Sequence, residues 1–325
     1  MNICVLTENH YKGGLNTVLI NLINSWPCSE DNFMLICNKG CPGLSSIHEK
    51  TNKKIDLIML EFFFANSNYR GFGDNIFSKY RALRGGFLLL EKLIQYPFLS
   101  MWYLLTLTIM FKSHKGFDRL LVVNGGYPAS LICRMSVIAW KMAGKKSPAV
   151  LSFHSTPSKP SFFNILPEYL IDYYVIKYSK YIIAVSNVTL KSLQKRKLFG
   201  QTDKLIYIHN GIQDPLNKTN ESYHYRIESK YKYCLMLASY HAYKGHEYAI
   251  NAFSEVIKAV PNAKLIMFGH GKTHEKRRII KQLEGLPDDN YYLGEFEDNP
   301  VGLINQSSVL LVPSQSLESF GLTII

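Results

Sequence analysis

Short apolar runs alternate with longer segments of helical period along the first two thirds of the chain. The runs are nearly continuous in apolar residues, which is typical of strands buried on both faces of a parallel sheet. The segments between them have helical spacing, so we expect helices on both faces of that sheet. The predicted strands are Ile3–Thr7, Phe33–Cys37, Ile55–Leu60, Leu120–Val123, Ala149–Phe153, Tyr181–Val185 and Leu205–Ile208, and the predicted helices include Leu15–Trp26, Ala129–Ala143 and Val188–Lys197.

The same alternation starts again after residues 214–230, a polar stretch rich in Asn, Ser and Tyr. A chain of 325 residues is too long for one ordinary core and short for three. We therefore predict two α/β domains, residues 1–215 and 216–325, with ligands bound at the carboxyl ends of the strands and between the domains. The strands predicted for the second domain are Tyr233–Ala238, Ala263–Phe268, Tyr291–Leu293 and Val309–Val312, and its helices are Glu247–Val260, Lys272–Leu283 and Pro300–Ser307.

One apolar stretch, Tyr96–Phe111, departs from this pattern because it has sixteen residues without a charge. A helix that crosses a bilayer needs about 20 such residues. The stretch predicts either a buried helix or a helix in the membrane interface, and a membrane span is the least favoured of the three. Trp102 and Tyr103 with basic flanks fit the interfacial alternative. The flanking basic residues are Lys79, Arg81, Arg84, Lys112, Lys115 and Arg119.

Basic residues are concentrated in the first predicted domain. Residues 1–215 have 25 Lys and Arg against 13 Asp and Glu, whereas residues 216–325 have 12 of each. This asymmetry indicates an anionic partner, either a phospholipid surface or nucleic acid, although a generally basic soluble surface explains the same numbers. The basic residues are not interleaved with an aromatic ribonucleoprotein motif or a helix-turn-helix pattern, so we expect no nucleic acid.

Composition and cysteine spacing exclude several other classes of protein. A hydrophobic content of 47% with 19% charged residues excludes a largely disordered chain. The six cysteines are scattered, and only Cys37 and Cys41 lie close together, so we interpret them as reduced thiols without a zinc site. The N-terminus lacks the charged, apolar and cleavage regions of a signal peptide, which predicts a cytoplasmic protein.

Two features at the ends of predicted strands in the first domain are candidates for ligand binding. Gly13-Gly14 follows the first strand and opens the first helix, where backbone N–H groups can bind a diphosphate, although an ordinary turn explains the pair as well. His154 follows the strand Ala149–Phe153, where an α/β sheet presents ligand-binding groups. Taken alone, this histidine is as readily structural as functional.

Two candidates in the second domain follow predicted strands in the same way. Lys244-Gly245 lies at the start of a predicted helix, where the lysine and the helix N-terminus can bind one phosphate, although a merely solvated lysine fits equally well. Gly269 belongs to a Gly-x-Gly turn that is compatible with a nucleotide but is not the full dinucleotide fingerprint.

The most specific motif comes last in the chain. Glu318 is followed by Ser319, Phe320, Gly321 and Leu322. At the opening of a helix, this order would aim a carboxylate and several backbone N–H groups into one pocket, which matches a ligand with both hydroxyls and phosphate.

Taken together, the order and spacing of these motifs resemble the retaining glycosyltransferase family 4. The resemblance covers nearly the whole chain and implies the GT-B fold, in which two Rossmann-like parallel-sheet domains face a cleft. The residues that carry it are Gly13-Gly14, His154, 184–187, 208–212, Lys244-Gly245, Ala249, 252–253, 268–271, 293–294 and 313–322.

The resemblance also implies roles for these residues. The family's glycine pair closes over the donor diphosphate, a histidine matching His154 lies beside the transferred sugar, and a cation matching Lys244 neutralises the leaving diphosphate. A carboxylate matching Glu318 holds sugar hydroxyls. The implied catalytic residues are therefore His154 and Glu318, with no metal and no cofactor. The implied donor-binding residues are Gly13, Gly14, Lys244, Gly269, Phe320, Gly321 and Leu322.

Two departures from the family's pattern bear on activity. Family members usually have an arginine five residues before the lysine, and here that position is Ser239. They also have a second glutamate that would fall at position 326, beyond Ile325. The sequence is therefore interpreted as a truncated member whose second domain is incomplete.

The resemblance predicts a retaining transferase that moves a sugar from a nucleotide-sugar, of the UDP type, to a lipid-linked or surface-polysaccharide glycan. Its hexosyl or N-acetylhexosaminyl substrate is left open. The basic first domain predicts peripheral contact with an anionic membrane at the inner face of the cell membrane. The alternative is a non-catalytic remnant that binds nucleotide-sugar or membrane without turnover.

Overall fold

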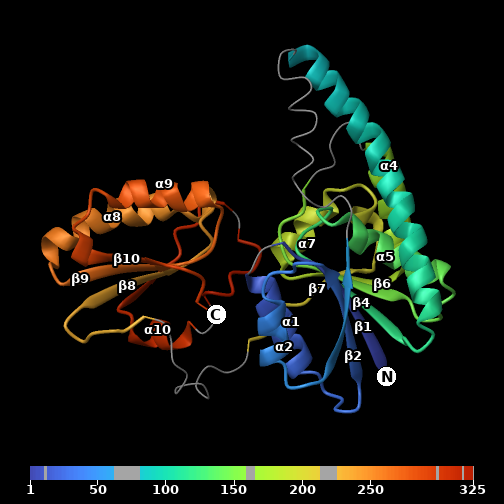
Figure 1. Ribbon diagram of the computed structural model, residues 1–325, viewed down its shortest axis with the longest axis horizontal. Coiled ribbons are helices and arrows are strands. Elements are labelled where there is room, and N and C mark those ends of the chain that lie inside the picture. The colour runs from blue at the N-terminus through green and yellow to red at the C-terminus, as the bar shows by residue number, and fades with distance from the viewer. Residues whose placement is uncertain are drawn as a thin grey trace. The chain divides into compact units, whose positions relative to one another are not determined.

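The computed structural model describes residues 1–10, 13–61, 81–158, 165–212, 225–297, 300–316 and 318–324, and for residues 81–95 it describes the backbone alone. The chain divides into two units (Figure 1). The first contains residues 1–11 and 15–210, and the second contains residues 211–325 with residues 12–14. The predicted domain boundary, between residues 215 and 216, lies outside the described residues.

The first unit is built on a seven-stranded sheet in which neighbouring strands are parallel. The strand order is β3-β2-β1-β4-β5-β6-β7, so β1 lies between β2 and β4. The predicted strands of this domain are confirmed, because each lies in the sheet. The strands are β1 (Asn2–Glu8), β2 (Asn32–Asn38), β3 (Ile55–Leu60), β4 (Arg119–Asn124), β5 (Ala149–Phe153), β6 (Ser179–Ala184) and β7 (Leu205–Tyr207).

Helices cover both faces of this sheet because successive strand residues point to opposite faces. Val5 packs with Leu19 of α1 on one face, whereas Leu6 belongs to a core with Trp140 of α5 on the other. α4, α5 and α6 cover this second face. The helices are α1 (Gly14–Asn24), α2 (Leu44–Lys50), α4 (Arg81–Ser113), α5 (Leu131–Met142), α6 (Ile165–Tyr178) and α7 (Asn187–Gln194), followed by the short η3 (Phe199–Gln201).

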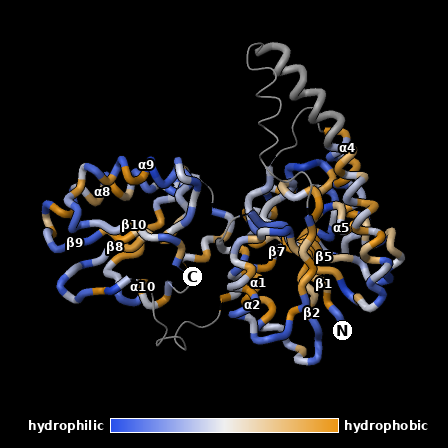
Figure 2. Tube along the Cα trace, in the orientation of Figure 1, coloured by the Kyte–Doolittle hydropathy of each residue, from blue (hydrophilic) through white to orange (hydrophobic). Residues whose placement is uncertain are grey.

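α4 contains the apolar stretch Tyr96–Phe111, and much of its described part is hydrophobic (Figure 2). Tyr103 and Leu107 are buried in the core, whereas Trp102 and Leu105 are exposed. The prediction of a buried helix is therefore correct for one side of α4 only. In the part of the chain that the structure describes, no helix has the length and apolar character needed to cross a bilayer.

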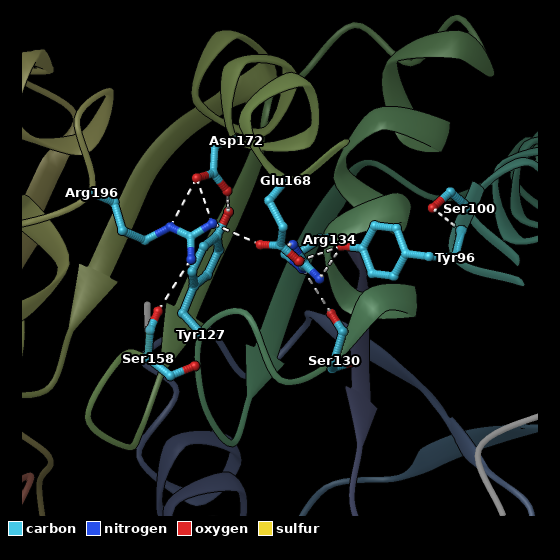
Figure 3. Close-up of polar contacts among 9 residues, drawn as sticks. All are labelled: Tyr96, Ser100, Tyr127, Ser130, Arg134, Ser158, Glu168, Asp172 and Arg196. Carbon is cyan, nitrogen blue, oxygen red and sulfur yellow. Dashed lines mark hydrogen bonds and ion pairs between the residues drawn. The ribbon is translucent and has the colours of Figure 1, made fainter. Parts of the chain in front are cut away.

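A buried ion network joins α5, α6 and the turn that follows α7 (Figure 3). Glu168 of α6 accepts hydrogen bonds from Arg134 of α5 at 3.0 Å and from Arg196 at 2.7 Å. Arg196 Nε also donates to Asp172 of α6 at 2.9 Å. All four side chains are buried, and two guanidinium groups balance two carboxylates, so no charge in the network is left uncompensated.

Hydroxyl groups and a backbone carbonyl extend this network (Figure 3). Tyr127 donates to Asp172 at 2.6 Å, and Tyr96 of α4 donates to Glu168. Arg196 Nη1 donates to the carbonyl oxygen of Ser158 at 3.2 Å. The network therefore fixes α4 and α6 to each other and holds the loop that follows β5.

The second unit contains a four-stranded parallel sheet in the order β10-β9-β8-β11. Leu265 and Met267 of β9 pack with Phe253 of α8 on one face, and Ile266 packs with Leu303 of α10 on the other. The predicted elements are confirmed here too. They are β8 (Lys232–Leu237), η5 (Ala242–Lys244), α8 (His246–Ala259), β9 (Ala263–Phe268), α9 (Thr273–Leu283), η6 (Asp288–Asn290), β10 (Tyr291–Gly294), α10 (Val301–Gln306) and β11 (Val309–Leu311).

Candidate functional site

Polar side chains gather where β1, β4 and β5 end at the carboxyl edge of the first sheet. In the order β3-β2-β1-β4-β5, β1 and β4 are the neighbours at which the chain switches direction across the sheet. Open α/β sheets bind ligands at the carboxyl ends of such strands. Thr7 lies near the end of β1, Asn124 ends β4, and His154 directly follows β5.

Three buried atoms at this edge, Thr7 Oγ1, Asn124 Nδ2 and His154 Nδ1, make no hydrogen bond to any residue that the structure describes. A buried polar group without a partner costs about 1–3 kcal/mol. Such atoms at the ends of three adjacent strands mark this edge of the sheet as a candidate ligand site, and alternation along the strands places Thr7 and Asn124 on opposite faces of it. Thr7 and Asn124 were not among the site residues predicted from the sequence. Their only signal is that each is a polar residue at the end of an otherwise apolar strand.

Burial keeps the His154 ring in its neutral form. Its Nε2 lies 3.0 Å from Ser152 Oγ, and its backbone N–H donates to the carbonyl oxygen of Asn124 at 3.0 Å. Burial lowers the pKa of His154 to about 4. At neutral pH the ring is thus an uncharged hydrogen-bonding group, suited to sugar hydroxyls rather than to phosphate charge.

The glycine pair lies at the start of α1, near asparagine residues that bond to one another. Asn9 N donates to Asn38 Oδ1 at 2.8 Å, and Asn9 Nδ2 donates to Asn16 Oδ1 at 2.7 Å. Gly13 and Gly14 do not have positive φ, and a Cβ added at Gly13 would meet nothing within 4 Å. Backbone strain therefore does not require glycine here. Close approach of a ligand to the glycine pair stays a prediction.

The structure brings together Lys244 and Glu318 of the second unit. Lys244 Nζ lies 2.6 Å from Glu318 Oε1, and Ser314 Oγ donates to the same oxygen at 2.5 Å. Burial of the Glu318 carboxyl works against ionisation, but the hydrogen bonds from Lys244 and Ser314 prevail and lower its pKa. A cation, a carboxylate and a hydroxyl thus form one polar group beside the N-terminus of α8.

Gly245 allows this arrangement because it lies between Lys244 and α8 with φ of +80°. A Cβ at this position would lie 2.0 Å from the carbonyl oxygen of Pro313. Only glycine permits both the left-handed backbone and the close approach of the segment that carries Ser314 and Glu318.

Replacing Gly245 by alanine should lower the free energy of unfolding by at least about 2 kcal/mol, because strain and a backbone clash act together. Urea unfolding followed by circular dichroism measures the change. Gly285→Ala is the control, since its φ is not positive and a Cβ there meets nothing within 4 Å. Equal stability of the two variants would contradict the assignment.

The Gly-x-Gly turn after β9 has a packing role. A Cβ at Gly269 would lie 2.0 Å from the carbonyl oxygen of Ala238, and one at Gly271 would lie 2.7 Å from Tyr240 Cβ. Tyr240 itself is fixed, because its hydroxyl donates to the carbonyl of Gly294. Tight packing therefore accounts for both glycines, and donor binding by Gly269 stays a prediction.

The segment after Glu318 differs from the expected helix opening. Residues 318–324 form bends and turns, and Gly321 has φ of +78°, a left-handed conformation that interrupts a helix. The predicted helix is therefore wrong for these residues. The structure places Phe320, Gly321 and Leu322 next to Glu318 in the chain without the row of N–H groups that a helix N-terminus provides.

His246, the first residue of α8, is a buried histidine that was not predicted from the sequence. It is 2% exposed, and neither ring nitrogen has a hydrogen-bond partner in the described part of the chain. Its ring packs against Tyr240 with the ring centres 5.6 Å apart. Burial first, and then the charges of Arg278 and Lys244, lower the pKa of His246 to about 4.

The two histidines predict a loss of stability in acid. Their pKa values of about 4 lie below 6.5, the ordinary value that applies in the unfolded chain. The unfolded state therefore binds protons more readily, so the free energy of unfolding should fall as pH drops from 6.5 to 4. Each histidine contributes up to about 1.4 kcal/mol per pH unit.

Urea unfolding at a series of pH values tests this expectation. His246→Phe keeps a ring against Tyr240 and should make the acid slope shallower, whereas His274→Phe on the exposed side of α9 should leave it unchanged. An unaltered slope in His246→Phe would rule out a contribution from this residue.

Ser239 occupies the position at which the resembled family usually has arginine. Its Oγ lies 3.0 Å from His241 Nδ1.

Among the residues described, no group of three or more His, Cys, Asp or Glu side chains could hold a metal ion. The expectation that no metal takes part stays a prediction.

Comparison with known proteins shows what the second unit is similar to. Residues 217–325 match one family model. The family is Glycosyl transferases group 1. This match includes Lys244, Ser314 and Glu318, the polar group described above, and it supports a transferase.

One curated relative is the poly(glycerol-phosphate) alpha-glucosyltransferase of Bacillus subtilis, which is 30% identical over 142 residues. The matched segment covers 43% of this chain and spans 20% of the length of that protein.

Solved structures show that the fold extends over the whole chain. Anabaena HepE in complex with UDP and glucose has a TM-score of 0.66 at 15% identity, covering 99% of this chain and 76% of that one. A glycosyltransferase from Rickettsia africae has 0.65 at 17%, covering 99% and 75%. The UDP-GlcNAc 2-epimerase of Neisseria meningitidis has 0.58 at 15%, covering 95% and 77%. The predicted fold class is confirmed: the chain has the two parallel-sheet units of the GT-B fold.

Proposed function

We propose that the chain is a retaining glycosyltransferase that moves a sugar from a UDP-sugar to a lipid-linked or surface-polysaccharide glycan. The observation that carries this proposal is the pair of contacts that Glu318 makes with Lys244 and Ser314 inside the segment that matches Glycosyl transferases group 1. HepE, the solved structure reported with UDP and glucose, supports the choice of donor. The name of the Bacillus relative supports a glucosyl group and an α-linkage.

In the proposed reaction, the acceptor hydroxyl oxygen bonds to the anomeric carbon while the bond from that carbon to the diphosphate breaks. The acceptor approaches the face that the diphosphate leaves, so configuration is retained, and the acceptor proton passes to the departing phosphate oxygen. Lys244 neutralises the developing diphosphate charge, as fixed cations do in transferases. Glu318 orients sugar hydroxyls, and the donor diphosphate competes with Glu318 for the Lys244 cation.

His154 takes a different part in the proposal. Its neutral ring suits a hydrogen bond with a sugar hydroxyl, because Nδ1 has no partner among the described residues. Gly13, Gly14 and Gly269 are proposed to let the donor approach the backbone, together with Phe320, Gly321 and Leu322. The proposal needs no metal or cofactor besides the donor.

We also propose that the protein works at the inner face of the cell membrane, in peripheral contact with anionic lipid. A lipid-linked acceptor places its reacting hydroxyl there, and the basic excess of residues 1–215 attracts such a surface.

Purified chain incubated with UDP-glucose and a lipid-linked glycan extract tests this function. The expected result is UDP release that depends on the acceptor, with an α-linked product identified by nuclear magnetic resonance. An inverted anomeric configuration would contradict the retaining mechanism.

A second candidate is a remnant that binds nucleotide-sugar without turnover. Ser239 favours it, because a hydroxyl hydrogen-bonded to His241 replaces a cation that would hold the diphosphate. UDP binding by calorimetry without UDP release from UDP-glucose would identify this case.

A further inference from the structure

The helices that cover one face of the first sheet present a broad apolar surface on their outer sides. Exposed residues of α4 recur at spacings of three and four, which places them on one side of the helix, opposite the buried Tyr103 and Leu107. These exposed residues are Phe98, Met101, Trp102, Leu105 and Ile109.

α6 provides the second part of this surface. Its outer residues follow the same helical spacing, opposite the buried Ile171 and Val175. α6 is joined to α4 through the bond from Tyr96 to Glu168, and α5 packs against both helices. The exposed residues are Ile165, Leu166, Tyr169, Leu170, Tyr173 and Tyr174. We call these eleven side chains, each 39–69% exposed, the α4–α6 surface.

Such a patch requires an explanation, because monomeric proteins rarely expose large contiguous apolar areas in water. The charges of the same helices are equally one-sided. The acidic residues of α6, Glu168 and Asp172, both point into the buried ion network. From Tyr96 to the end of α4 there is no Asp or Glu. The α4–α6 surface is thus apolar and aromatic without an acidic side chain of α6 or of this part of α4.

Basic side chains lie at one end of the α4–α6 surface. α4, α5 and α6 each lead into a strand of one parallel sheet, so the three helices run in the same direction. Their last turns contain Lys112, Lys141 and Lys177, all exposed. A lysine also stabilises the C-terminus of its own helix, but that effect does not account for the inward burial of both acidic residues of α6.

We propose that the α4–α6 surface docks on an anionic lipid bilayer, with its apolar side chains in the interface and the lysines against phosphate headgroups. Apolar burial and attraction to anionic lipid act together at such surfaces. Trp102 and the tyrosines of α6 suit the boundary between acyl chains and water. The inference rests on the membrane contact in the proposed function and identifies the residues that make it.

A second copy of the chain is the other occupant to consider. In a twofold pairing, each copy presents the same patch to the other. Neither α6 nor the part of α4 from Tyr96 onward offers an acidic side chain at this surface to the lysines of a partner copy. Charge complementarity therefore favours an anionic bilayer.

Cosedimentation of the full chain with vesicles tests the proposal without any sugar nucleotide, so a failure of sugar transfer does not affect its outcome. Vesicles of phosphatidylglycerol with phosphatidylcholine are compared with vesicles of phosphatidylcholine alone. The pairs Leu105→Gln with Ile109→Gln and Leu166→Gln with Leu170→Gln should each reduce partitioning at least about tenfold. Ile280→Gln on α9, which is 47% exposed, is the matched control and should bind normally.

The charge of the surface is tested separately. Lys177→Glu in the last turn of α6 should weaken binding to vesicles that contain phosphatidylglycerol. Lys281→Glu in the last turn of α9 should not. Circular dichroism and UDP affinity should be unchanged in all variants, because none of these residues lies in the core or among the proposed donor contacts.

Two results would overturn the proposal. One is unchanged vesicle binding in both pairs of glutamine variants. The other is a dimer, measured by light scattering, that dissociates in the glutamine variants, together with no binding of the unaltered chain to vesicles. In that case a second copy covers the surface.

Discussion

Replacing Lys244 by methionine should reduce kcat/KM for transfer from UDP-glucose by about 100-fold or more. The side chain is proposed to neutralise charge that develops on the departing diphosphate, and loss of one such contact has an effect of this size. Methionine keeps the length and the apolar part of the side chain, so the change removes mainly the charge. Initial rates of UDP release measure it, and UDP affinity by calorimetry should weaken in the same variant.

Controls separate this effect from a general loss of structure. Lys258→Met on α8 removes a lysine whose side chain contacts the exposed Glu255, and its activity should stay within about twofold of the unaltered chain, as for other surface changes. Glu318→Gln should also reduce kcat/KM strongly. Because Lys244 and Glu318 are in contact, the double variant should lose less than the two single losses combined. Full activity in both single variants would refute the site.

Replacing Glu168 by leucine should lower the free energy of unfolding of the first unit by about 3–5 kcal/mol. The change leaves Arg134 and Arg196 buried with Asp172 as their only carboxylate in the network. Removing one partner of a buried ion pair exposes the cost of taking the other charge out of water. Tryptophan fluorescence during urea unfolding reports on this unit, because Trp26, Trp102 and Trp140 all lie in it.

The matched control is Glu49→Leu, an exposed position on α2 that should change stability by less than about 0.5 kcal/mol. The double variant that also replaces Arg134 by methionine should recover part of the loss, because the remaining buried charges, Arg196 and Asp172, stay paired with each other. A loss below about 1 kcal/mol in Glu168→Leu would show that the network is hydrated and weak.

The strands were predictable from the sequence because their physical signal is local. Ile3–Thr7 and Ala263–Phe268 are continuous apolar runs, and a strand buried on both faces has no other composition. The restart of the pattern after residue 230 predicted a second sheet for the same reason. The left-handed turn at Gly321 shows the limit of local signals, because the same residues read as a helix opening in the sequence.

The candidate site was predictable only in part. Lys244 and Glu318 were predicted from a resemblance, but they are 74 residues apart in the chain, and no local pattern predicts their contact. Gly245 makes this contact possible. Because it has no Cβ, the carbonyl oxygen of Pro313 can approach its backbone, and the segment that carries Ser314 then lies beside η5. Thr7 and Asn124 were missed because a single polar residue at the end of a strand is common and becomes informative only when its neighbours also lack partners.

The sequence by itself determined which residues form strands and helices, since burial on one or both faces leaves a period in the apolar residues. It also determined the charge asymmetry between the two units. Only the tertiary structure decided which side of α4 is buried and that Glu168 and Asp172 point inward to Arg134 and Arg196. The reason is physical: the sign of a charged side chain is local, but the cost of burying it depends on partners that the fold brings from distant parts of the chain.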